Sequence, residues 1–184
     1  MSINQNNPTL TTEHLVLRPP RSDDAKALYE SVGCDEDLTR YTGWNPYTSL
    51  AAAERKIAED LNAASQGEGW SWIITKNGKF IGTVAAYDVN KDIASAELGL
   101  TVIKSEWQKG YGSEALAAVV SFLLSEGSLN RVCAWCHADN IGSEKAMRHA
   151  GMTCEGVFRQ AMRDPSGKLA DQKWFARIKE DFRE

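Results

Sequence analysis

A glycine turn between a strand and a helix constrains this chain most. Residues 94–103 alternate in polarity, which predicts a half-buried strand. One face carries Ala94, Ala96, Leu98, Leu100 and Val102, and the other carries Ser95, Glu97, Gly99 and Thr101. The turn itself reads Trp107-Gln108-Lys109-Gly110-Tyr111-Gly112-Ser113. An amphipathic helix follows, with Leu116, Val119, Val120, Leu123 and Leu124 on one side.

Such a turn is suited to an anionic ligand. Glycine lets the backbone approach a ligand closely, and the first N–H groups of a helix have no partner within it. A phosphate or pyrophosphate is therefore the expected ligand, and Lys104 and Lys109 could add positive charge. A branched side chain at Gly112 should then exclude the ligand. A plain strand-to-helix turn explains the glycines equally well.

Two nucleotide-binding motifs fit less well. Gly110-x-Gly112-x-x-Ala115 matches a dinucleotide fingerprint, but residues 104–109 separate it from the strand, and the acidic residue expected about 20 positions later is missing. The P-loop pattern of Gly-x4-Gly-Lys-Ser/Thr is absent from the sequence.

A second segment runs from Asp139 to Met152. Asn140 is a suitable helix cap, Ser143 falls in the first turn or itself starts the helix, and Gly151 is a natural residue just beyond a helix end. A helix cap alone is a sufficient explanation of Asn140.

The remaining pattern predicts one mixed α/β domain over residues 10–182, preceded by a polar extension at 1–9. Strands are expected at 13–18, 70–75, 80–87, 94–103, 131–137, 153–161 and 169–179. Asn77-Gly78 is a strong hairpin turn between the second and third of these. One early helix should start at Ser22 and stop at Gly33. Thr48 or Ser49 caps the next, whose apolar stripe is Leu50, Ala53, Ile57 and Leu61.

Composition excludes several classes of protein. The 184 residues carry a formal net charge of −4, which disfavours binding to a nucleic-acid backbone. No run approaches the roughly 18 apolar residues of a membrane span, and the polar N-terminus lacks a signal peptide. The four cysteines are then reduced thiols, and we expect a cytoplasmic protein.

Together, these segments resemble the GNAT superfamily of acetyl-CoA-dependent N-acetyltransferases. The likeness rests on the glycine turn that opens a helix, on the strand that follows it, and on the Asn-x-x-Ser segment that ends in Ala-Gly-Met. The RimJ/RimL-type branch is indicated by a further set of segments. These are residues 11–19, 23–25, 39–44, 96–100 and 155–156, Asp171 and 175–177.

The resemblance implies a strongly bent, mainly antiparallel sheet of six to seven strands flanked by about four helices. The fourth and fifth strands should splay so that acetyl-CoA, the co-substrate, inserts between them. The resemblance implies that backbone amides of residues 107–113 wrap the pyrophosphate. The residues expected there are Gln108, Lys109, Gly110, Tyr111, Gly112 and Ser113. Asn140 should contact the pantetheine arm, with Ser143 nearby.

Direct acetyl transfer needs a neutral amine, donors for the oxyanion and a proton for the departing thiolate. The resemblance places a donor N–H near Val102 or Ile103. We favour Glu97 as the base, because a mid-strand carboxylate must be solvated or lie in a polar cleft. A structural glutamate is the alternative. Ser143 is the acid that the resemblance suggests, with Tyr111, Tyr87 and Tyr41 as rivals.

Cys133-Ala134-Trp135-Cys136-His137 matches a haem-attachment pattern, and Cys-x-x-Cys can hold zinc. The motif falls within a predicted strand and lacks a second ligand pair, so we expect no metal. Trp44 is the tryptophan best placed to touch the acceptor. The predicted enzyme acetylates a protein N-terminus or a small amine and is a monomer or homodimer. A non-catalytic acyl-CoA-binding or sensory module is the alternative.

Overall fold

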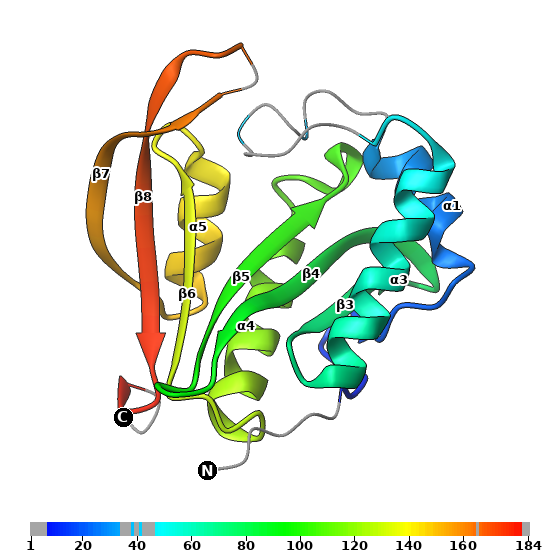
Figure 1. Ribbon diagram of the computed structural model, residues 1–184, viewed down its shortest axis with the longest axis horizontal. Helices are drawn as coiled ribbons and strands as arrows, with labels where there is room; N and C mark the ends of the chain where they lie inside the picture. The colour runs from blue at the N-terminus through cyan, green and yellow to red at the C-terminus, as the bar shows by residue number, and fades with distance from the viewer. Residues whose placement is uncertain (1–6, 34–37, 39–40, 42–46, 165, 182–184) are drawn as a thin grey trace.

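The computed structural model describes residues 7–33, 38, 41, 47–164 and 166–181. They form one open sheet in the order β1-β2-β3-β4-β5-β6-β8-β7, in which every neighbouring pair is antiparallel except β5–β6 (Figure 1). The strands are β1 (Leu10–Thr11), β2 (Val16–Arg18), β3 (Trp70–Lys76), β4 (Lys79–Asn90), β5 (Ser95–Val102), β6 (Arg131–His137), β7 (Thr153–Arg163) and β8 (Leu169–Ile178). The mixed α/β class is confirmed.

The strand count differs slightly from expectation, because the sheet has eight strands. The short edge strand β1 pairs with β2 and accounts for the addition. The strand expected at 13–18 begins only at Val16, since a turn from Thr12 to Leu15 precedes it. Asn7 and Pro8, expected to belong to a polar extension, hydrogen-bond to Ser71 and Trp72 of β3.

Helices cover both faces of the sheet. They are α1 (Asp24–Leu28), continued by a π-helical turn at Tyr29–Gly33, α3 (Leu50–Gln66), α4 (Tyr111–Ser125) and α5 (Ile141–His149). Figure 1 shows α1 and α3 on one side and α4 on the other. The apolar side of α4 packs into a core with Ala96, Leu98 and Phe175, while Ala53 and Ile57 of α3 pack with Ile73. No helix among the described residues is long and apolar enough to cross a membrane.

Local signals predicted most boundaries. The side chain of Ser49 accepts a hydrogen bond from Ala52 N–H and caps α3. Positive φ at Asn77 and Gly78 gives the tight turn between β3 and β4. Ser22 was the wrong start for α1, which begins at Asp24 without a side-chain cap. The apolar stripe of α3 is buried only at its centre, because Leu50 and Leu61 are 39% and 40% exposed.

The arrangement of β5 and β6 matters most for the site. These parallel neighbours pair only through Ser95↔Arg131, Ala96↔Val132 and Glu97↔Cys133. Beyond that point both strands continue, to Val102 and His137, without pairing to each other. Figure 1 shows them diverging toward their carboxyl ends, as expected. The segments after both strands lead to α4 and α5, so the amino ends of these helices lie beyond the split.

Candidate active site

The glycine turn exposes the amino end of α4. Gln108 and Gly110 have φ of 60° and 87°, and α4 starts at the next residue, Tyr111. The first backbone bond of the helix runs from Glu114 N to Gly110 O at 3.0 Å. The N–H groups of Tyr111, Gly112 and Ser113 precede that bond and so have no partner within the helix. These groups can hold an anion.

The two glycines of the turn serve different purposes. A Cβ added at Gly110 would meet nothing within 4 Å, so this position faces open space. A Cβ at Gly112 would lie 3.3 Å from Leu100 Cδ2 and 3.5 Å from Val102 Cγ2. A side chain at Gly112 would thus first meet β5. Gly112 lets α4 pack closely on β5, and Gly110 faces open space.

Two lysines lie beside this turn, both within 4.0 Å of Glu106. Lys109 Nζ lies 3.1 Å from Glu106 Oε2, and Lys76 Nζ lies 4.4 Å from the centre of the Tyr111 ring. A hydrogen bond with Tyr111 is the main cause that raises the pKa of Lys76, so this lysine stays protonated. Lys76 was missed from the sequence because it belongs to the distant β3–β4 hairpin. A hollow of ≈ 380 Å³ opens beside Lys109 and Gly110, with His149 of α5 at its edge.

Backbone donors line the split along β5. Ile103 N–H donates to Ile81 O of β4 at 2.9 Å, so it is engaged and does not face β6. Backbone groups alternate in direction along a strand, so those of Leu100 and Val102 point the other way. Trp107 Nε1 donates to Val102 O at 2.6 Å from that side. The N–H groups of Leu100 and Val102 therefore face the split, whereas that of Ile103, the other donor that the resemblance implies, is bonded to β4.

Asn140 stands at the amino end of α5. Its Oδ1 accepts a hydrogen bond from Ser143 N–H at 3.0 Å, which is the geometry of a helix cap. Ser143 is partly buried in the first turn. The capping prediction is thus confirmed, and the cap places both side chains directly after the loop that leaves β6.

Glu97 occupies the last paired position between β5 and β6. Its Oε1 accepts two hydrogen bonds, from Tyr87 Oη at 2.9 Å and from Trp135 Nε1 at 2.8 Å. Burial, followed by the charge of Glu97, raises the pKa of Tyr87, so the phenol stays protonated and donates. The split thus begins at a carboxylate held by two neutral donors. Trp135 was not foreseen as its partner.

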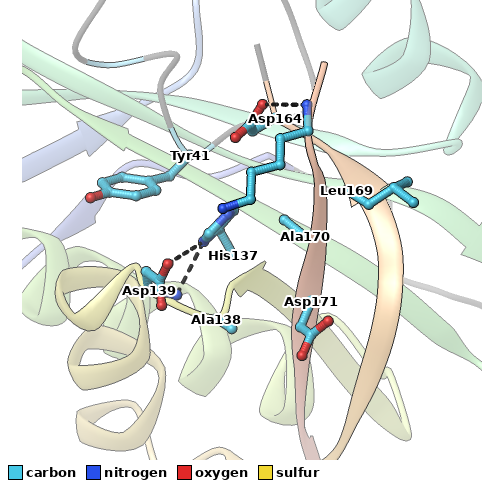
Figure 2. A pocket seen from close by; sticks show the side chains of 9 residues that line it. Tyr41, His137, Ala138, Asp139, Asp164, Leu169, Ala170 and Asp171 are labelled. Atoms are coloured by element: carbon cyan, nitrogen blue, oxygen red, sulfur yellow. Dashed lines mark hydrogen bonds and ion pairs between the residues drawn. The ribbon is translucent and has the colours of Figure 1, made fainter. Parts of the chain in front are cut away.

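A cavity of ≈ 340 Å³ lies at the carboxyl end of β6 (Figure 2). His137, Ala138 and Asp139 line it together with Tyr41 and residues of the β7–β8 hairpin. The hairpin contributes Asp164, Lys168, Leu169, Ala170 and Asp171. The sequence did not reveal this cavity, because segments far apart in the chain build it.

The cysteine motif makes no site of the kind its spacing suggests. Cys136 is buried in the core, and burial raises the pKa of its thiol to about 11. Cys133, an odd number of positions away along a strand, projects from the opposite face. No group of three or more His, Cys, Asp or Glu residues in the described ranges could hold a metal ion. Cys34 and Trp44 lie outside the described residues.

The parallel strands β5 and β6 separate beside the exposed amino end of α4. A fold with this arrangement can hold a phosphorylated ligand between the two strands. Residues 14–153 match the family model of the acetyltransferase (GNAT) domain, and the chain belongs to that family. It is an N-acetyltransferase that moves an acetyl group from acetyl-CoA to an amine.

Relatives that align with most of this chain are also named as acetyltransferases. The uncharacterized N-acetyltransferase YoaA of Bacillus subtilis is 31% identical over 84% of this chain and 88% of its own length. The uncharacterized N-acetyltransferase p20 of Bacillus licheniformis is 28% identical over 95% of this chain and 98% of its own. The ribosomal-protein-serine acetyltransferase of Escherichia coli is 24% identical over 82% of this chain and 85% of its own.

Solved structures share the fold. RimL, the ribosomal L7/L12 α-N-protein acetyltransferase, in complex with coenzyme A, has a TM-score of 0.87 and 22% identity, with 92% of this chain and 97% of that chain covered. RimJ of Mycobacterium smegmatis has a TM-score of 0.88 and 20% identity, with 98% and 91% covered. The microcin C7 self-immunity acetyltransferase MccE, in complex with acetyl-CoA and AMP, has a TM-score of 0.83 and 18% identity, with 91% and 93% covered.

Proposed function

We propose that acetyl-CoA binds with its pyrophosphate at the glycine turn and its pantetheine arm in the split between β5 and β6. The N–H groups at the start of α4 that have no partner within the helix, the open space at Gly110 and the nearby lysines support the first part. The backbone of Leu100 and Val102, which faces the split, supports the second. Gln108, Lys109, Tyr111 and Ser113 belong to the same turn, and Asn140 and Ser143 flank the arm from α5.

The proposed reaction is direct transfer. The neutral amine attacks the thioester carbonyl carbon, a C–N bond forms, and the C–S bond breaks. The N–H groups of Val102 and Leu100 stabilise the oxyanion. Glu97 accepts the proton that the amine loses, and Ser143 donates a proton to the departing CoA thiolate. Both hydrogen bonds to Glu97 end on Oε1, which leaves Oε2 available for the proton.

The acceptor is an amine of a protein N-terminus or of a small molecule. A ribosomal-protein acetyltransferase among the relatives supports the first, and an acetyltransferase crystallised with AMP has the same fold. A monomer or homodimer in the cytoplasm, where acetyl-CoA is made, completes the proposal. Sedimentation and cell fractionation test these last two points.

Glu97→Gln tests the catalytic assignment. The amide keeps the size and the Oε1 acceptor but cannot take a proton, so transfer to a lysine-like amine should slow by about 10²–10⁴. The loss should shrink as pH rises and be smaller for an α-amino acceptor, whose pKa of about 7.7–8.0 lies below the 10.4 or so of lysine. Rates across pH and calorimetric acetyl-CoA titrations of both proteins provide the measurement.

Two outcomes would contradict this role. Full activity of the variant between about pH 6 and 9, a range that spans the α-amino titration, would make Glu97 a structural residue. Joint loss of activity and acetyl-CoA affinity would indicate a collapsed cleft instead of a missing base.

A further inference from the structure

Two side chains from different strands bind the same oxygen of Glu97. Tyr87 lies directly opposite Glu97 on β4, and its Oη donates to Glu97 Oε1 at 2.9 Å. Trp135 lies on β6, two residues beyond Cys133, which is level with Glu97, and its Nε1 donates to the same Oε1 at 2.8 Å. The carboxylate is therefore held from both neighbouring strands at the point where β5 and β6 part. Its second oxygen, Oε2, has no hydrogen-bond partner among the described residues.

Both donors are neutral groups. The phenol stays protonated, because burial is the main cause that raises the pKa of Tyr87, and the indole N–H of a tryptophan acts only as a donor. The part of the chain that the structure describes offers Glu97 no ion pair, and Arg131, on the same face of β6, is bound to Glu155 by two hydrogen bonds. A cation beside a carboxylate favours its charged form and so weakens it as a base. The two donors thus fix the orientation of Glu97 while leaving it without a counterion.

A glycine on β5 makes room for the phenol. Gly99 follows Glu97 by two positions along the strand, so both residues face the same side of the sheet. A Cβ added at Gly99 would lie 3.1 Å from Cε1 and 3.5 Å from Oη of Tyr87, so the ring lies directly over this residue. A methyl group there would displace the ring by a few tenths of an ångström. Gly99→Ala therefore moves the phenol without removing any polar group.

We propose that Tyr87 and Trp135 are positioning residues, which fix Glu97 Oε1 so that Oε2 faces the acceptor amine, and that Gly99 maintains this arrangement. The inference rests on the proposed role of Glu97 as the base. The single phenolic proton of Tyr87 is already donated to Glu97, so Tyr87 is not the acid that protonates the CoA thiolate. Because misplacing a catalytic group by about 1 Å can cost about 10²-fold in rate, each donor affects transfer without touching the substrate.

A double-mutant cycle with Glu97→Gln tests the positioning role. Tyr87→Phe and Trp135→Phe keep an aromatic ring and remove the donor, so each should lower kcat about tenfold in the otherwise wild-type protein, with an unchanged KM for acetyl-CoA. In the Glu97→Gln background no base remains to be oriented, so neither change should lower kcat further. The amide keeps the Oε1 acceptor, so any purely structural effect of losing a donor persists in that background, where urea unfolding measures it.

The pH profile and a small displacement of the ring provide two further readouts. The loss of activity in Tyr87→Phe should shrink as the pH rises, as is expected of Glu97→Gln, because the acceptor amine then loses its proton unaided. Gly99→Ala should lower kcat when Tyr87 is present. It should not lower kcat further in the Tyr87→Phe background, because no hydroxyl group is left to be displaced.

Trp174→Phe is the matched control for Trp135→Phe. The two tryptophans are level with each other on β8 and β6, and Trp174 Nε1 donates to Gln172 Oε1 instead of to Glu97. The control removes the same indole N–H from the same face of the sheet, so it should keep the wild-type kcat and pH profile.

Three results would overturn the positioning role and leave the proposed base in place. These are a wild-type kcat in both phenylalanine variants, an equal loss of kcat with and without Glu97→Gln, and a loss that comes with a higher KM for acetyl-CoA. The second would show that Tyr87 or Trp135 acts independently of Glu97, and the third would indicate a collapsed cleft. Full activity of Glu97→Gln alone would overturn the proposed base, and the positioning role with it.

Discussion

At the scale of single residues, Asp24 shows how one carboxylate organises the start of the chain. It is 7% exposed, and Arg18 binds it through two hydrogen bonds of 2.8 and 2.6 Å. Arg21 N–H donates a third at 2.7 Å. Burial raises the pKa of Asp24, but the bonds from Arg18 and Arg21 outweigh it, so the net pKa lies below the ordinary value.

The sign of this shift predicts a pH dependence. Because the pKa of Asp24 is lower in the folded state, its ionised carboxylate stabilises the fold fully above the unfolded-state pKa of about 3.9. This stabilisation is lost as the pH falls through the folded-state pKa. Asp24→Asn should cost about 2 kcal/mol near neutral pH, because Arg18 loses its charged partner. Urea unfolding at pH 7 and at pH 3 measures it. A variant that is as stable as wild type at pH 7 would contradict the account.

Gly110 predicts a separate effect on the ligand. Gly110→Ala should destabilise the fold by about 1 kcal/mol, because φ is 87°, and should also weaken acetyl-CoA binding through a methyl group in the open space. Gly78→Ala is a matched control, with φ of 75° and equally open surroundings on the β3–β4 hairpin. Calorimetric titration of both variants provides the comparison. Equal acetyl-CoA affinity in the two would place the ligand away from Gly110.

At the scale of elements, α5 depends on Asn140, the residue that caps its amino end. Asn140→Ala should destabilise the protein by about 1 kcal/mol, because Ser143 N–H loses its partner. Asn140→Ser should restore most of that stability, since serine is also a good cap. If Asn140 also contacts the pantetheine arm, the serine variant will recover stability without recovering acetyl-CoA affinity. Recovery of both would make Asn140 a structural cap alone.

The sequence predicted those elements whose determinants are local. The alternation of residues 94–103, the turn at Asn77-Gly78 and the cap at Asn140 each act within a few residues, and the structure contains all three. The splay of β5 and β6 came from the family resemblance, because no local pattern specifies where two strands stop pairing. Edge strand β1 was missed, since two residues carry too little periodicity.

The same distinction between local and long-range determinants applies to the residues of the candidate site. The glycine turn and Asn140 could be found from motif spacing, whereas Lys76, Trp135 and the cavity around His137 arise from contacts between segments far apart in the chain. The sequence did not show that Ile103 N–H is bonded to Ile81 O, because backbone direction depends on the pairing with β4. The packing of Gly112 against β5 could not be predicted, because it depends on the orientation of α4.

At the scale of the whole molecule, the fold brings the split between β5 and β6 and a cavity to the same end of β6. Helix α4 presents its amino end beyond the carboxyl end of β5, and the β7–β8 hairpin lines the cavity with Tyr41. In the proposed reaction, the acetyl group and the amine approach from different segments and meet near Glu97. A non-catalytic acyl-CoA-binding module would need only the first of these features.

Stoichiometric acetyl transfer tests the central claim most directly. The purified chain should be incubated with acetyl-CoA and with each amine and peptide acceptor in turn, while free thiol is read by absorbance and the acceptor by mass spectrometry. The account predicts one free thiol for every acetylated acceptor, with both products requiring both substrates. Saturable acetyl-CoA binding without thiol release above the rate in the absence of acceptor would contradict it.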